Sequence, residues 1–128
     1  MISALRIERT STTPLVFWDN DASELLIDGI CCPIDAHNFF TPVEDWLKEN
    51  SEKLTQKTRF VFCLKFFNSS SAKAIFQFLK ELKPIVAEKK IGNIYWVIED
   101  NDDFMIDSHE DYQELLEMKI EVIERKEK

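Results

Sequence analysis

Glycine and proline are scarce in this chain, which has two glycines and four prolines among its 128 residues. So few flexible or chain-breaking residues leave little room for a long linker, and the length suits one domain with a substantial hydrophobic core. Hydrophobic residues make up 45% of the chain and charged residues 31%, which is the balance of an ordinary soluble globular protein. We therefore expect residues 1–128 to form a single domain.

Long apolar runs and an excess of basic residues are also missing. No run approaches the roughly 18–20 apolar residues that a membrane helix needs. The first ten residues, MISALRIERT, lack the apolar region of an export signal. The net charge of −8 argues against nucleic acid and against an anionic membrane surface, because both attract basic proteins. We expect a cytoplasmic protein that binds neither.

Only three cysteines are present, and they do not form a disulfide framework. A metal site is suggested by Cys31, Cys32, Asp35 and His37, but the two cysteines are adjacent, whereas paired zinc ligands usually have two to four residues between them. The acidic run 100–103 lacks the glycine that a calcium-binding EF-hand loop needs at its sixth position, where Met105 stands. We therefore predict no metal and no cofactor.

The most informative stretch runs from Arg59 to Leu82. It opens with the apolar run Phe60–Leu64, which is typical of a strand buried on both faces. Asn68 and three consecutive serines then favour a turn or a helix cap. Apolar residues follow at helical spacing: Ala72, Ile75, Phe76, Leu79 and Leu82. The pattern predicts strand, serine turn and helix, with the turn at the carboxyl end of a central strand, where α/β sheets commonly place their sites.

The remaining pattern predicts an α/β fold. We expect an N-terminal antiparallel hairpin, a mainly parallel sheet with the strand 60–66 at its centre, and helices at about 38–49, 71–88 and 108–118. The first helix has two candidate starts, a capping box at Thr41–Glu44 or a cap at Asp35 that leaves Pro42 inside the helix. Ser108–Asp111 is a capping box that predicts the start of the third helix.

The segment NSSSAKAIFQFLKEL, residues 68–82, resembles the N-[ST]-S-S-x-K signature of the SiaC family of bacterial regulatory phosphoproteins. Further similarities are Thr13-Pro14 before a strand, FFTPVEDWL at 39–47, Trp96 before the acidic run, and the closing SHEDYQELLEMKIEVIE. Together they cover roughly residues 13–124. One loop departs from the family's G-E-S-Y-P-E-like pattern, because Gly29–Ile34 contains Cys31 and Cys32 and neither acidic position. No role of that loop is therefore carried over.

The resemblance implies a single-domain, STAS-like α/β sandwich that is not an enzyme. In the family, the first hydroxyl residue after the asparagine is phosphorylated, which is Ser69 here, with Ser70 and Ser71 as the less favoured candidates. Asn68, the three serines and Lys73 would then contact the partner. The implied partners are a serine/threonine kinase with a histidine-kinase-like ATPase fold, a PP2C-type phosphatase and a diguanylate cyclase that the unphosphorylated form can bind and activate.

Three other interpretations remain open at this point. The serines alone fit a turn and helix N-cap with no further role. Anti-sigma-factor antagonists with a STAS domain carry a D-S-[SA]-G motif at a similar turn, but Asn68 and Ser71 replace its aspartate and glycine. A small thiol enzyme could use Cys31 or Cys32 with His37 as base, although no oxyanion motif accompanies them.

Overall fold

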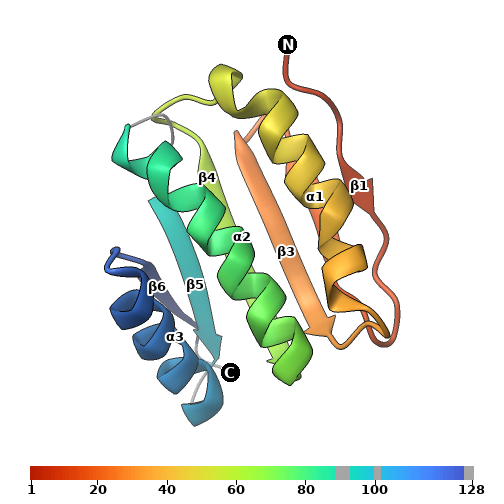
Figure 1. The fold of residues 1–128 in the computed structure, drawn as a ribbon, viewed down its shortest axis with the longest axis vertical. Helices are drawn as coiled ribbons and strands as arrows, with labels where there is room; N and C mark the ends of the chain where they lie inside the picture. Colours follow the sequence, from red (N-terminus) through yellow and green to blue (C-terminus); the bar gives the residue numbers. More distant parts are fainter. Residues whose placement is uncertain (89–92, 100–101, 126–128) are drawn as a thin grey trace.

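The computed structural model describes residues 1–88, 93–99 and 102–125 (Figure 1). The described residues form six strands, three α-helices and one short 3-10 helix. The strands are β1 (Arg6–Ile7), β2 (Leu15–Asp19), β3 (Glu24–Cys31), β4 (Arg59–Phe67), β5 (Asn93–Glu99) and β6 (Glu121–Arg125). The helices are α1 (Ala36–Asn50), η1 (Ser51–Lys53), α2 (Ser69–Ala87) and α3 (Asp103–Leu116).

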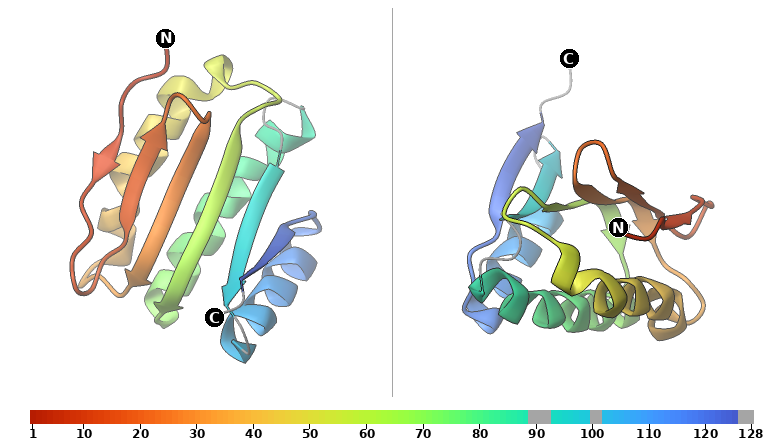
Figure 2. Two further views of the ribbon diagram at one scale, coloured as in Figure 1. Left: turned by 180° about the vertical axis from the view of Figure 1, so that it is seen from behind. Right: turned by 90° about the horizontal axis from the view of Figure 1, so that it is seen from above.

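The strands form one sheet in sequence order, β1-β2-β3-β4-β5-β6. The pairs β1–β2 and β2–β3 are antiparallel, and β3, β4, β5 and β6 run parallel. Each new parallel strand is added on the same side of the previous one. When every connection between such strands is right-handed, all the connecting helices lie on one face of the sheet. Figure 2 shows α1, α2 and α3 on that face and, in the described part of the chain, no helix on the other. The predicted α/β fold with an N-terminal antiparallel hairpin is confirmed.

The core lies between the sheet and the helices. Phe78 of α2 is fully buried and contacts Phe40 of α1 and both Phe60 and Phe62 of β4, with ring centroids 6.0–6.2 Å apart. Trp96 of β5 is also fully buried, and its indole Nε1–H donates to a main-chain oxygen of α3 at 3.0 Å. Helix α2 therefore packs across the centre of the sheet, and its N-terminus is fixed relative to β4.

The strand β4 is central, as predicted, and Phe60–Leu64 is buried on both faces although helices cover only one. On the helix-free face Val61 and Cys63 are 7% and 6% exposed. The guanidinium of Arg125 lies against Cys63, with Nη1 3.4 Å from Sγ. Neighbouring side chains thus shield the apolar centre of that face, and Cys63 is the small buried residue that its strand position suggests.

The helix starts differ from some of the predictions. Asp35 caps α1, its Oδ1 accepting from the amide of Asn38 at 3.0 Å, and Pro42 lies inside the helix. The start predicted for the third helix is wrong, because α3 begins at Asp103 after an N-cap at Asp102 and Ser108 lies in its interior. A side chain that accepts from the first free amides decides each start, whereas a capping-box pattern inside a helix has no free amide to satisfy. Asp100 and Asn101 lie outside the described residues.

Candidate functional site

The serine segment forms the first turn of α2, which begins two residues before the predicted start. β4 ends at Phe67 and Asn68 is the N-cap, so a single residue separates strand from helix. The Asn68 Oδ1 accepts from the amide of Ser71 at 2.9 Å and from the hydroxyl of Ser70 at 3.2 Å. Because the cap satisfies the amide of Ser71, the amides of Ser69 and Ser70 are left without an intrahelical acceptor at the positive end of the helix dipole.

Burial separates the three serines. The side chains of Ser69 and Ser70 face solvent, whereas Ser71 is 0% exposed. Ser71 lies against Cys31 at the end of β3, where burial raises the pKa of the thiol to about 11 and the neighbouring serine hydroxyl only partly offsets this. A kinase could reach Ser71 only if the start of α2 unfolded. The accessible hydroxyls are therefore those of Ser69 and Ser70.

Two hollows meet at Ser69. The larger, of about 860 Å³, is a groove between α1 and α2, whose lining includes Ser70 and Lys73 as well as Ser69. The smaller, of about 370 Å³, lies toward α3. Its lining is mostly apolar: Phe66, Phe67, Asn68, Ser69, Ala72 and Phe104. Ser69 thus stands on the ridge between a polar groove and an apolar hollow.

Exposed apolar side chains gather around this ridge, at the carboxyl ends of the parallel strands. A register shift in the β3–β4 pairing opposes Ile30 to Phe66, which is 47% exposed, while Phe67 turns into the core. Phe66 stacks on Phe104 at the start of α3, with centroids 5.3 Å apart. Sequence periodicity did not identify this patch, because the shift depends on strand pairing. A patch of this kind, rimmed by polar groups, is typical of a protein-binding surface.

The groove between the helices also contains a pair of carboxyl groups. The pKa of Glu44 in α1 is raised to about 7, first by burial, then by a hydrogen bond with Glu81 of α2 and by the charge of Glu81. His37 and Lys48 act in the opposite direction. The two glutamates come from different helices, so no local motif could have indicated that they meet.

The two thiols at the end of β3 differ in burial. Cys31 is fully buried and holds its proton at neutral pH, which makes it a poor nucleophile. Cys32 is partly buried, and its backbone amide donates to the oxygen of Thr12 at 2.7 Å.

Among the described residues, no group of three or more histidine, cysteine, aspartate or glutamate side chains is placed to hold a metal ion. None of the helices in the described ranges is long and apolar enough to cross a membrane.

Solved structures with the same fold come from Pseudomonas aeruginosa. SiaC of that organism is 21% identical, with a TM-score of 0.80 over 98% of this chain and 99% of that chain. SiaC in complex with the diguanylate cyclase SiaD, described as its activator, gives 21% identity and a TM-score of 0.80 over 96% of this chain and 99% of that chain. No curated protein sequence matches significantly.

The family comparison agrees with the serine motif and with the fold. A family model described as "SiaC family regulatory phosphoprotein" matches residues 7–125, which is nearly the whole chain. The matched region contains the capped serine turn, the groove and the apolar patch. The chain therefore belongs to the SiaC family of regulatory phosphoproteins.

Proposed function

We propose that this protein is a non-catalytic switch in which reversible phosphorylation of Ser69 controls binding to a signalling partner. The observation that carries the proposal is the position of Ser69, exposed in the first turn of α2 between a polar groove and an apolar hollow. The partner we favour is a diguanylate cyclase, because a related SiaC forms a complex with one. A serine/threonine kinase with a histidine-kinase-like ATPase fold would add the phosphoryl group and a PP2C-type phosphatase would remove it, in the cytoplasm.

The fold can accept a phosphoryl group at Ser69. The group adds a charge of about −1.5 to −2 and three acceptor oxygens. At this position it would lie in solvent near the free amides of the first helical turn, which favour an anion. None of the core contacts of α2 involves the Ser69 side chain, so phosphorylation should leave the sheet and its helices unchanged.

A bound partner would respond much more strongly than the fold. The exposed side chains beside Ser69, including Phe66 and Phe104, suit an apolar contact that buries the serine hydroxyl. A phosphate buried in such an interface without a compensating charge on the partner protein costs several kcal/mol, on the order of a hundredfold or more in affinity. The unphosphorylated form is therefore the one that binds.

The test uses the protein with its kinase, ATP and the cyclase. Mass spectrometry should locate the phosphate on Ser69, and the phosphorylated protein should bind the cyclase at least about a hundredfold more weakly than the unmodified protein. Ser69→Ala should bind constitutively and resist the kinase, whereas Ser69→Asp should weaken binding less than phosphate does, because it carries one charge and fewer acceptors.

The neighbouring serines serve as controls. Ser70→Ala should still be phosphorylated at Ser69, because Ser70 is exposed and its hydroxyl donates to the cap residue Asn68 and not to Ser69. Modification found only at Ser70 or Ser71 would refute the site. Equal affinity of the two forms for the cyclase would refute the switch, and binding to an anti-sigma kinase in place of a cyclase would favour the antagonist function.

A further inference from the structure

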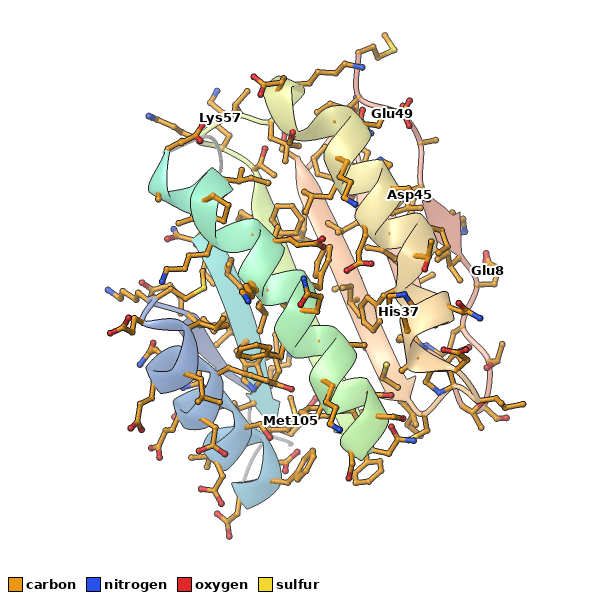
Figure 3. All side chains as sticks on the ribbon, viewed as in Figure 1. Glu8, His37, Asp45, Glu49, Lys57 and Met105 are labelled. Atoms are coloured by element: carbon orange, nitrogen blue, oxygen red, sulfur yellow. The ribbon has the colours of Figure 1, made fainter. Side chains whose placement is uncertain are left out.

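The groove between α1 and α2 offers positive charge close to Ser69. Both helices start at the carboxyl ends of the strands and run side by side in the same direction (Figure 1). His37 lies in the first turn of α1 (Figure 3), and it lines the same groove as Ser69 and Lys73. The amino ends of two helices and the side chains of His37 and Lys73 therefore belong to the groove that Ser69 also lines.

Among the described residues, His37 interacts with the Glu44 carboxyl through its charge, and no partner is found for Lys73. The side chains of His37 and Lys73 are exposed and form no hydrogen bond or ion pair with another described residue. The only hydrogen bond recorded for His37 beyond the helix backbone is through its main-chain oxygen, which accepts from the Thr41 hydroxyl at 3.1 Å. Both side chains can consequently turn toward a new anion without breaking a described hydrogen bond or ion pair.

We propose that the phosphoryl group on Ser69 binds in this groove, held by the His37 imidazolium and the Lys73 ammonium. This inference rests on the proposed function, and it adds a phosphate-binding role for His37, which had suggested only metal or thiol chemistry in the sequence. Charge-assisted hydrogen bonds from two cations to phosphate oxygens are short and strong. The alternative hollow toward α3 is apolar and has no cationic lining residue.

The other charged groups of the groove are compatible with this role. Asp35, Glu44 and Lys48 belong to α1 and its cap, and Glu81 belongs to α2. The Asp35 carboxylate is occupied in capping α1. Glu44 keeps its proton up to about neutral pH because its pKa is about 7, so the far end of the groove repels an anion less than its composition suggests. The phosphoryl group would thus occupy one part of the groove between the helices.

The experiment installs phosphoserine at position 69 by genetic code expansion, so that no kinase is required. The pH titration of the phosphate is then followed by ³¹P NMR in the full chain. Neighbouring cations favour the dianion, so its pKa should lie about 0.5–1 unit lower than in the His37→Asn and Lys73→Gln variants, each of which loses one of the two cations. Lys80→Gln is the matched control, because Lys80 is an exposed lysine of α2 that does not line the groove.

Equal titration midpoints in all four proteins would overturn the phosphate site. A midpoint that moves as much in Lys80→Gln as in Lys73→Gln would also overturn it, because the effect would then be general charge. Titration of the same phosphoserine protein with the diguanylate cyclase tests the proposed function separately. Undiminished cyclase binding would refute the switch while a low phosphate pKa still supported the site, so the two failures are distinguishable.

Discussion

At the scale of single residues, burial distinguishes side chains that are identical in the sequence. Three consecutive serines carry the same chemistry, yet only Ser71 is enclosed, against Cys31. The helical period of about 100° per residue turns one of every three or four side chains toward the core. Once α2 starts at Ser69, this geometry leaves Ser69 and Ser70 on the outside. Burial thus disfavours Ser71 but does not choose between Ser69 and Ser70, and only the resemblance to the family motif favours Ser69.

The raised pKa of Glu44 predicts how the stability of the protein depends on pH. Its pKa is about 7 in the folded protein and 4.5 in a free side chain, so the folded state binds the proton more tightly. The stabilisation from this proton is present below about pH 4.5 and is lost as the pH rises through 7. Glu44→Gln keeps a hydrogen-bond donor toward Glu81 and cannot ionise. Solvent screens the repulsion because Glu44 is only partly buried, so at pH 8 the Tm of Glu44→Gln should exceed that of the wild type by only roughly 3 °C, or about 1 kcal/mol, and at pH 5 the two should agree.

Thermal unfolding followed by circular dichroism at both pH values measures this difference. Glu114→Gln, on the exposed side of α3, removes the same charge at a site where no such pairing occurs among the described residues. It should therefore shift the Tm equally at pH 5 and pH 8. If the Tm difference between Glu44→Gln and the wild type is the same at pH 5 and at pH 8, Glu44 ionises normally.

At the scale of elements, long periodic segments were predictable and their starts were less so. The buried run of β4 was placed correctly from residue type and spacing. The apolar face of α2 was placed correctly at Ile75, Leu79 and Leu82, but the prediction omitted the fully buried Phe78 and included Phe76, which is only partly buried. The start of α3 was missed because two patterns compete there, a capping box at Ser108 and a lone aspartate at Asp102. Side-chain pairs between elements, such as Glu44 with Glu81, depend on how the helices pack and leave no trace in local sequence.

The corrected start of α3 can be tested by replacing each of the two candidate cap residues, Asp102 and Ser108, by alanine. The Asp102 Oδ1 accepts from the amide of Met105 at 3.2 Å, so Asp102→Ala should cost about 1 kcal/mol of unfolding free energy. Ser108 lies in the helix interior, and its hydroxyl donates to the oxygen of Phe104 at 2.8 Å. Ser108→Ala should be neutral or slightly stabilising, because alanine has the highest helix propensity. Urea unfolding of both variants gives the comparison, and a larger loss for Ser108→Ala would place the helix start later.

At the scale of the whole molecule, the helices cover one face of the sheet and arginines lie on the other. The chain has four arginines, and all contact that helix-free face. The guanidinium of Arg6 lies 4.9 Å from the ring centroid of Phe17, and that of Arg59 lies 5.9 Å from Tyr95. The remaining two contact Asp28 and Cys63. Long side chains of this type can shield apolar surface while keeping their charge in water, which explains how the face stays polar without a second helical layer.

The sheet order predicts how protection against hydrogen exchange is distributed. Local opening costs most where a strand is paired on both sides and packed against the core, and least at the edges. Amides of 60–64 in β4 should therefore exchange slowest, while those of the edge strands β1 and β6 exchange fastest. If phosphorylation at Ser69 acts on the surface alone, a phosphoserine at that position should leave the β4 rates unchanged and slow exchange only in the first turns of α1 and α2. Exchange measured by mass spectrometry or NMR on both forms decides this. Faster exchange in β4 after phosphorylation would mean that the modification loosens the core, and the switch would then work by partial unfolding.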